Sequence, residues 1–223
     1  MNLIEYPDRE MMMIDLANQL AGELNAGLLT HDRVSFAVPG GTTPGPVFDS
    51  LSAADLHWDR INVMLTDERW VPEEHERSNT RLLRERLLTN RAAMAHFVPL
   101  YAETETPEEA MDGLIAGIMP VLPVSVLLLG MGADGHIASL FPGADRLSDA
   151  LESDAPPLMA MRAPGVPEPR VTLTAPVLSE AMSIHILITG EEKREALERA
   201  RHADRLTAPV RVVLGDATVH WAA

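Results

Sequence analysis

The chain contains no cysteine among its 223 residues. This absence excludes a disulfide framework, a thiolate metal site and a cysteine nucleophile. Lysine is nearly absent as well, since Lys193 is one of 18 cationic residues and the other seventeen are arginine. Because a compact ammonium group and a planar guanidinium bind ligands differently, Lys193 is a candidate ligand-binding residue. The alternative is that it lies by chance on a solvated helix.

The sequence also shows no targeting signal and no membrane-spanning segment. The first ten residues lack a basic stretch followed by an apolar core, so no secretory signal is predicted. The uncharged stretch 113–133 has the length of a membrane span, but Pro120 and Pro123 interrupt it. A helix end, a turn and a buried strand explain it better. With no linker, repeat or low-complexity tract, we expect one cytoplasmic domain covering residues 1–223.

Positive charge is scarce, and the formal net charge is −15. Such a chain repels nucleic acids and anionic membranes, so neither is an expected partner, and no obligate protein partner is predicted. A small anionic ligand would need a local cationic pocket to overcome this overall field.

Apolar runs of strand length alternate with helical patterns along the chain, which predicts an α/β fold: a single-domain, doubly wound, mostly parallel sheet flanked by helices. The expected strands are 34–38, 61–65, 97–101, 124–129, 158–161, 170–174, 183–188 and 210–214. Helices are expected over 8–29, from 44, over 80–88 and 107–119, from 176, and over 191–201. The loops 39–44, 66–70, 130–136 and 189–193 all follow strands, so they should meet at one edge of the sheet.

The first of these loops combines two glycines, Gly40 and Gly41, with two hydroxyl residues, Thr42 and Thr43, before a predicted helix. Free backbone N–H groups, hydroxyl donors and a helix N-terminus together can bind an anion such as phosphate. An ordinary strand-to-helix turn is the alternative interpretation.

The third loop places Asp134 and His136 two residues apart, directly after the buried strand 124–129. Its glycines match G-x-G-x-x-G, but they lie far from the first strand, and an aspartate there would face the pyrophosphate. No G-x-S-x-G elbow is present, and two residues are too few for a metal site. The remaining interpretation is that His136 is a general base or acid, oriented by either Asp67 or Asp134.

Four motifs, in order and with suitable spacing over residues 34 to 198, resemble the 6-phosphogluconolactonase family. They are Gly40-Gly41-Thr42-Thr43-Pro44, Thr66-Asp67-Glu68-Arg69 with Val71-Pro72 and Ser78-Asn79, the stretch from Gly130 to Pro142 with Asp134-Gly135-His136, and Arg170-Val171-Thr172-Leu173-Thr174. The third motif is highly specific. The loop 143–169 matches only loosely, and the C-terminus 219–223 is abbreviated.

The resemblance implies a Rossmann-like fold shared with glucosamine-6-phosphate deaminases and hydrolysis of 6-phospho-D-glucono-1,5-lactone in the cytoplasmic pentose phosphate pathway. It implies a small sugar phosphate lactone as substrate and no cofactor or metal. It assigns water activation to His136, with Asp67 close by. The residues matching the substrate and phosphate site are Gly40, Gly41, Thr42, Thr43, Arg69, Arg170 and Lys193; Arg69 could also meet the reacting carbonyl.

Two alternatives remain. Deaminases and isomerases of the same superfamily resemble this chain through Asp-Gly-His but continue with Asn-Glu-Pro, where the glutamate takes part in ring opening. Here the same register reads Leu140-Phe141-Pro142, which favours a lactonase. The second alternative is a sugar-phosphate sensor without catalytic activity, which would leave His136 without an obvious use.

Overall fold

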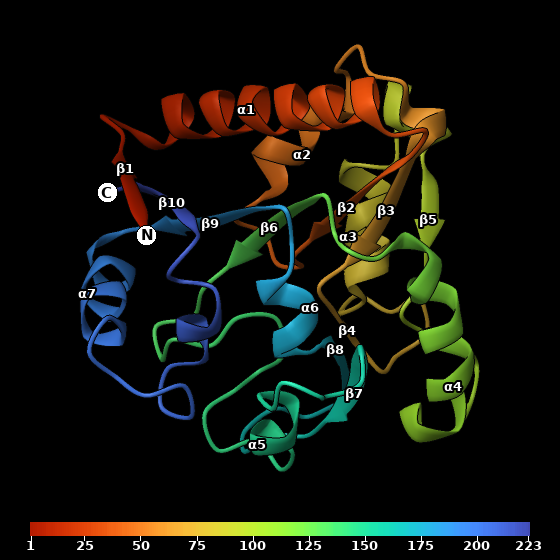
Figure 1. Ribbon diagram of the computed structural model, residues 1–223, viewed down its shortest axis with the longest axis vertical. Helices are drawn as coiled ribbons and strands as arrows, with labels where there is room; N and C mark the ends of the chain where they lie inside the picture. Colours follow the sequence, from red (N-terminus) through yellow and green to blue (C-terminus); the bar gives the residue numbers. More distant parts are fainter.

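Seven parallel strands form the main sheet in the order β1-β10-β9-β6-β2-β3-β5 (Figure 1). The computed structural model describes all residues, 1–223. The strands are β1 (Asn2–Glu5), β2 (Val34–Val38), β3 (Ile61–Leu65), β5 (His96–Val98), β6 (Val126–Gly130), β9 (Ser183–Thr189) and β10 (Thr218–Ala222). The prediction of a doubly wound, mostly parallel sheet is therefore confirmed.

The centre of the sheet consists of β2 and β3, whose residues are all buried, and β6, which is buried up to Leu129. Strands packed on both faces need mainly apolar side chains on both sides, which explains the unbroken apolar run of β6 and the mainly apolar β2 and β3, where Ser35 and Asn62 are the exceptions. From β2 the chain continues outward to β3 and β5, whereas from β6 it continues the other way to β9 and β10. The strand order thus reverses between β2 and β6, where ligands bind in open α/β sheets.

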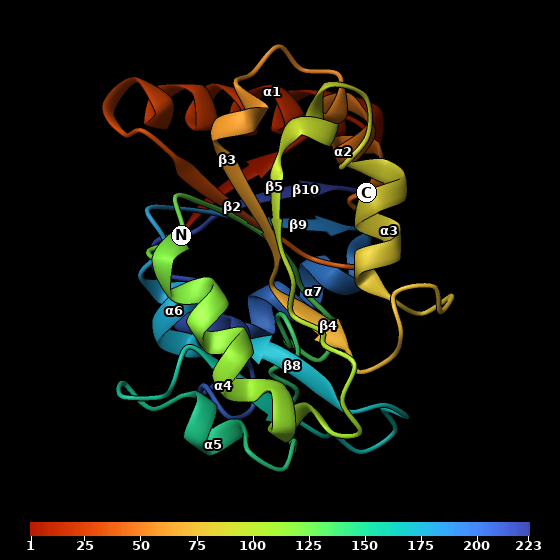
Figure 2. The same cartoon turned by 90° about the vertical axis from the view of Figure 1, so that its right-hand side faces the viewer.

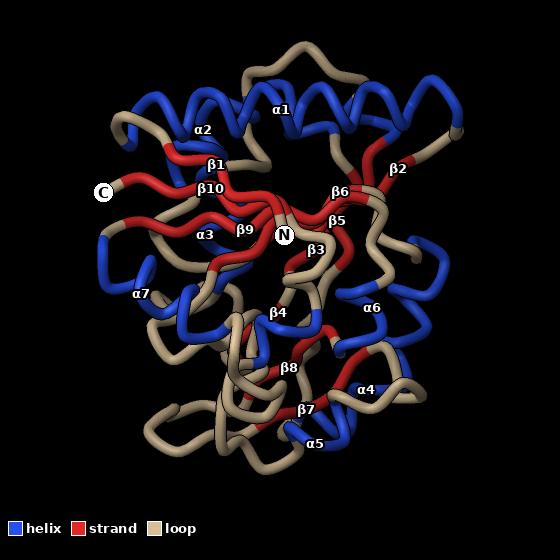
Figure 3. Tube along the Cα trace, turned by 60° about the vertical axis from the view of Figure 1, so that its left-hand side comes forward, coloured by secondary structure: helices blue, strands red, loops and turns tan.

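Helices cover both faces of the main sheet. On one side lie α1 (Arg9–Thr30) and α2 (Gly45–Ser52), and on the other lie α4 (Pro107–Ile118), α6 (Ala175–Ser179) and α7 (Glu191–Ala200) (Figures 2 and 3). The remaining helices are α3 (Asn79–Arg86) and the short α5 (Leu147–Ala150), which was not predicted. No helix combines the length and the hydrophobicity needed to cross a membrane.

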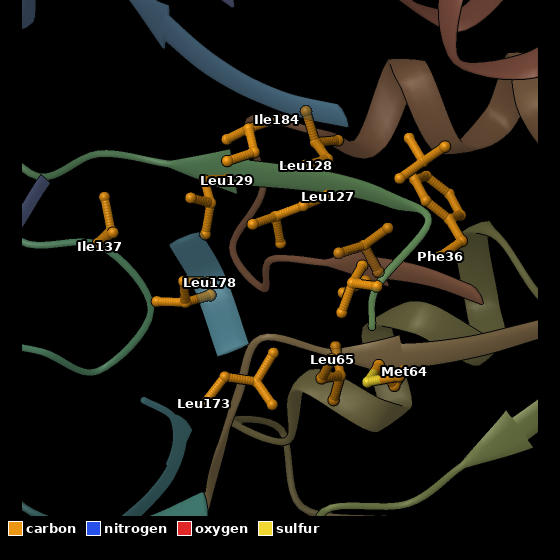
Figure 4. Close-up of a cluster of buried hydrophobic side chains, with 14 of the residues drawn as sticks. Phe36, Met64, Leu65, Leu127, Leu128, Leu129, Ile137, Leu173, Leu178 and Ile184 are labelled. Atoms are coloured by element: carbon orange, nitrogen blue, oxygen red, sulfur yellow. The ribbon is translucent and has the colours of Figure 1, made fainter. Parts of the chain in front are cut away.

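A second, antiparallel sheet of three strands was not expected from the sequence. It contains β4 (Asp67–Arg69), β8 (Arg170–Leu173) and β7 (Leu158–Met161) in that order. The chain continues from β3 almost directly into β4, and Leu173 N donates to the carbonyl of Thr66. Figure 4 shows Leu65 and Leu173 in one buried cluster with Leu129 of β6. The small sheet therefore packs against the main sheet at the edge where the predicted site loops lie.

The prediction of a closing strand at 210–214 is wrong. Pro209 begins a short 3₁₀ helix, Pro209–Val212, because proline fits the first turn of a helix and has no N–H for a strand ladder. The last strands of the sheet are instead β10 and β1, which were missed. The C-terminal residues 219–222, whose packing the sequence left open, thus lie between β9 and β1.

Two buried histidines, His185 in β9 and His220 in β10, lie outside the predicted site loops. Their rings share a hydrogen bond of 3.0 Å, His185 Nε2 lies 2.9 Å from Glu23 Oε2, and His220 Nδ1 lies 2.9 Å from the hydroxyl of Tyr6. Burial, helped by the nearby charge of His185, lowers the pKa of His220 to about 4. His220 is therefore neutral in the folded protein at neutral pH.

Acidification should destabilise the protein through His220. Its folded-state pKa of about 4 is below the ordinary value of 6.5 expected on unfolding, so between these pH values the unfolded state binds a proton that the folded state does not. The unfolding free energy should fall by about 1.4 kcal/mol per pH unit in this window, or about 2 kcal/mol from pH 6.5 to pH 5. Above pH 6.5, the ordinary pKa of histidine, the contribution of His220 to the unfolding free energy no longer changes with pH.

Urea unfolding at a series of pH values measures this slope. A His220→Asn variant, which cannot titrate, should show a flatter dependence, whereas His96→Asn at an exposed position should keep the wild-type slope. An equal slope in the His220 variant and the wild type would contradict the assignment.

Candidate active site

A cavity of about 330 Å³ opens at the carboxyl ends of the parallel strands. Its walls come from the segments after β2, β3 and β6, from β8 and from the first turn of α7. The four predicted segments therefore meet at one edge, although 67–69 forms the strand β4 and not a loop. The meeting point is the place where the strand order reverses.

Most of the predicted site residues line this cavity. They are Gly40, Gly41, Thr43, Asp67, Arg69, His136, Arg170 and Lys193. Two of the predicted residues do not. Asp134 lies behind His136, and Thr42 is exposed, with its carbonyl oxygen accepting a hydrogen bond from Gly45 N in the turn that starts α2. The structure does not bring the Thr42 side chain to the cavity wall.

The glycine loop after β2 requires its two glycines for different reasons. Gly41 has a φ of 83°, a conformation that residues with a Cβ rarely adopt. At Gly40, a Cβ would overlap the side chain of Asn79, whose amide donates to the carbonyl of Asp67 at 2.9 Å. Pro44 provides no side-chain cap for α2. Gly45 N already donates to Thr42 and Pro46 has no N–H, so the first-turn backbone N–H that remains available to a ligand is that of Val47.

His136 is held by Asp134 and not by Asp67. The imidazole Nδ1 lies 2.6 Å from Asp134 Oδ1, which also accepts the backbone N–H of His136 at 3.1 Å. Partial burial raises the pKa of Asp134, but the charge and the N–H donors of His136 outweigh this effect and lower it overall. A carboxylate only accepts, so Nδ1 carries the proton and Nε2 is the basic nitrogen.

The loop that carries His136 is closely supported by its own backbone and by the 208–214 segment. Gly132 N donates to the carbonyl of His136 at 2.9 Å, and Val210 N donates to the carbonyl of Gly135 at 3.0 Å. Ala138 has a φ of 48°, which is strained for a residue with a Cβ. This strained residue lies in the cavity wall, and the hydrogen bonds around it hold the loop in one conformation.

Asp67 is buried and is held by hydroxyl groups. Ser139 Oγ donates to Asp67 Oδ2 at 2.5 Å, Thr66 Oγ1 donates to Oδ1 at 3.2 Å, and Arg170 Nη1 lies 3.8 Å from Oδ2. No hydrogen bond joins Asp67 to His136. Asp67 is therefore a counter-charge for Arg170, and sequence reasoning missed Ser139 as its partner.

Arg170 is the most buried cation of the site, with 7% of its surface exposed. Burial lowers the pKa of its guanidinium and Arg69 lowers it further, while Asp67 raises it. The buried Nε atoms of Arg69 and Arg170 have no hydrogen-bond partner in the protein. Both arginine side chains line the cavity, so their guanidinium groups are well suited to bind an anionic ligand there.

The ring of Phe141 connects the cationic and the basic parts of the cavity. Its centroid lies 4.4 Å from that of the His136 imidazole, and the guanidinium carbon of Arg170 lies 5.9 Å from it. An aromatic ring therefore occupies the position where the deaminase motif has a glutamate. Asp134 is the only carboxylate that is hydrogen-bonded to His136.

Lys193 lines the cavity from the first turn of α7 and makes no ion pair. A cation is unfavourable at a helix N-terminus, and Glu191 and Glu192 lie in the same turn. A bound anion would interact favourably with both the ammonium group and the helix N-terminus.

Glu68 is a supporting residue that sequence reasoning did not identify. Its fully buried carboxylate accepts N–H groups from Arg69, Asn79 and Thr80 at 2.7–2.8 Å and the hydroxyl of Thr80 at 2.7 Å. Burial raises its pKa despite these donors. Glu68 thus fixes the start of α3 beside the glycine loop. No three His, Asp or Glu side chains are grouped to hold a metal ion.

Comparison with known proteins gives consistent matches over nearly the whole chain. The family model of glucosamine-6-phosphate isomerases/6-phosphogluconolactonase matches residues 7–221. A 6-phosphogluconolactonase of Rhizobium meliloti is 41% identical over 215 residues, covering 93% of this chain and 92% of the relative. The crystal structure of a 6-phosphogluconolactonase from Shewanella baltica has a TM-score of 0.96 at 31% identity and covers 100% of this chain and 97% of its own.

A monomeric glucosamine-6-phosphate deaminase shares the fold alone. Its structure has a TM-score of 0.82 at 16% identity and covers 100% of this chain and 97% of its own. The expected fold shared with glucosamine-6-phosphate deaminases is thereby confirmed.

Proposed function

The chain belongs to the glucosamine-6-phosphate isomerase/6-phosphogluconolactonase family, and from this premise we propose that it hydrolyses 6-phospho-D-glucono-1,5-lactone to 6-phospho-D-gluconate. The relatives support a carboxylic ester hydrolase that acts on a small sugar phosphate in the pentose phosphate pathway. The observation that carries the proposal is the Asp134–His136 pair, which places a basic imidazole in a cavity lined by three cationic side chains.

In the proposed reaction, His136 Nε2 takes a proton from water as that water attacks the lactone carbonyl. Asp134 keeps Nδ1 protonated and stabilises the imidazolium that forms. Arg69, whose side chain lines the cavity, is the candidate for stabilising the oxyanion. The imidazolium then donates its proton to the ring oxygen as the ester bond breaks. This step needs no covalent intermediate and no cofactor.

The phosphate of the substrate is assigned to the glycine loop and the adjacent cations. Gly40, Gly41 and Thr43 line the cavity beside the start of α2, and Arg170 and Lys193 add positive charge. Charge-assisted hydrogen bonds of this kind are about twice as strong as neutral ones. They would offset the unfavourable field of a chain with a net charge of −15.

Acid release in a pH-stat tests this function directly. Freshly generated 6-phosphogluconolactone is supplied with and without enzyme, and the spontaneous hydrolysis is subtracted. We expect acceleration by the enzyme. If there is none, ammonia release from glucosamine 6-phosphate tests the deaminase alternative, and failure of both assays would favour a sensor without catalytic activity.

Replacing Lys193 with alanine should raise KM by about 10- to 100-fold, because a charge-assisted contact to phosphate contributes about 1.5–3 kcal/mol. The value of kcat should stay within about threefold, since the ammonium group binds the phosphate in the ground state and the transition state alike. Initial rates over a range of lactone concentrations give both values.

A matched control is Arg201→Ala, which removes one cation just after the other end of α7, where Arg201 pairs with Glu198. Its KM should equal that of the wild type. A Lys193→Ala variant with unchanged KM would contradict the proposed phosphate site.

A further inference from the structure

We propose that Ser139 is a positioning residue that keeps the guanidinium of Arg170 available to the substrate phosphate by occupying the carboxylate of Asp67. The substrate assignment rests on the function proposed above, whereas the positioning itself rests on the geometry of three buried side chains. Ser139 and Asp67 do not need to touch the substrate for this role.

Ser139 is completely buried and is fixed at both its side chain and its backbone. Its hydroxyl donates to Asp67 Oδ2 at 2.5 Å, and its backbone N–H donates to Thr172 Oγ1 at 3.1 Å. Thr172 lies in β8 beside Arg170, and Asp67 lies in β4. Ser139 therefore joins the loop of His136 to both strands that carry the arginines of the site.

Asp67 and Arg170 are both more than nine-tenths buried, yet they do not form a close ion pair. Arg170 Nη1 lies 3.8 Å from Asp67 Oδ2, beyond hydrogen-bond distance. A buried carboxylate and a guanidinium normally close to about 2.8 Å in a bidentate pair. Here Oδ2 already accepts the hydroxyl of Ser139, and Oδ1 faces Thr66. The strongest acceptor next to Arg170 is thus partly occupied.

As a consequence, Asp67 balances the charge of the Arg170 guanidinium at a distance of 3.8 Å, and the donors of Arg170 remain unpaired. Arg170 Nε has no partner in the protein, and Asp67 is the only carboxylate within 4.0 Å of its nitrogen atoms. The charges of Arg69 and Arg77 also lower the pKa of Arg170, and that of Glu168 raises it. An anion in the cavity can therefore bind Arg170 without first breaking an internal ion pair.

The same segment also contacts the general base. Phe141, two residues after Ser139, packs against the His136 imidazole and lies under the Arg170 guanidinium. Ser139 thereby fixes the anion-binding group relative to the basic nitrogen, which positions the lactone carbonyl for attack once the phosphate is bound.

Removing the hydroxyl in a Ser139→Ala variant should free Asp67 Oδ2 to pair directly with Arg170 and should draw the guanidinium out of the cavity. We expect KM for the lactone and Kd for inorganic phosphate to rise about tenfold, with kcat within about threefold of the wild type. Ser139→Cys fills the place of the hydroxyl with a slightly larger thiol that is a much weaker donor, and it should reproduce the effect if the alanine variant folds poorly. Ser52→Ala removes a buried hydroxyl far from the site and should leave both constants unchanged.

A double-mutant cycle separates positioning from a general loss of structure. In an Asp67→Asn background the competing charge is absent, so adding Ser139→Ala should produce no further rise in Kd for phosphate. Titration calorimetry with inorganic phosphate measures this without the lactone, so a wild-type enzyme inactive on lactone would refute the function and not the positioning. An unchanged phosphate Kd in Ser139→Ala, or equal effects of Ser139→Ala in both backgrounds, would overturn the inference.

Discussion

Replacing His136 with alanine should lower kcat for lactone hydrolysis by about 10³-fold, within the range that a positioned general base contributes. The imidazole is the basic group that Asp134 orients at the cavity, and its Nε2 has no other partner in the protein. The phosphate-binding residues come from other segments, so Kd for inorganic phosphate should change by less than about twofold. Acid release in a pH-stat and titration calorimetry measure the two quantities.

The matched control is His31→Ala, at an exposed histidine after α1, far from the cavity. It should retain wild-type kcat, which excludes a general effect of losing one imidazole. Full activity in the His136 variant would rule out the proposed mechanism. A comparable loss of phosphate affinity in that variant would indicate instead that the whole cavity had collapsed.

The central strands were predictable because their side chains face the core on both sides. Val34–Val38 and Ile61–Leu65 were predicted with the bounds that the structure shows, since four of the five residues in each strand are apolar; the exceptions, Ser35 and Asn62, are buried as well. Edge elements lack this signal. The strand β1 has only two half-buried residues, and β10 contains His220, which is buried only because His185 and Tyr6 satisfy its ring nitrogens.

The segment at 210–214 shows how local pattern and tertiary context compete. Its apolar residues read as a strand, but Pro209 initiates a 3₁₀ helix, and the N–H of Val210 binds the carbonyl of Gly135. The apolar side chains are buried in either case. Hydropathy alone therefore could not distinguish a sheet strand from a support for the His136 loop.

For the site, the sequence predicted which residues gather at the cavity but not how they pair. Asp67 and Asp134 were equally suitable partners for His136, and only the fold shows that Asp67 turns to Ser139 and Arg170. A serine in a loop carries no sign of which carboxylate it will meet across the fold. Side chains that bind ligands are thus easier to predict than the residues that hold them in place.

Replacing Gly132 with alanine should lower kcat by about 10²-fold, the second-largest effect expected of a single substitution here. A Cβ at this position would overlap His136 Nδ1 and lie 2.6 Å from Asp134 Oδ1, so it would enter the hydrogen bond that orients the base. Gly132 N and O also bind the carbonyl of His136 and the N–H of Gly135, so the backbone cannot easily move away. The imidazole must therefore shift from its catalytic position.

If the His136 imidazole is displaced, kcat and the Kd for phosphate should respond differently. The three atoms nearest to a Cβ at Gly132 belong to His136 and Asp134 and not to the phosphate-binding residues, so Kd for inorganic phosphate should stay within about twofold while kcat falls. Gly113→Ala is the matched control: a Cβ on that exposed face of α4 meets nothing within 4 Å, so kcat should be unchanged and stability should rise by up to about 1 kcal/mol. Wild-type kcat in Gly132→Ala would show that the Asp134–His136 pair tolerates displacement, and it would remove the geometric basis for assigning the base.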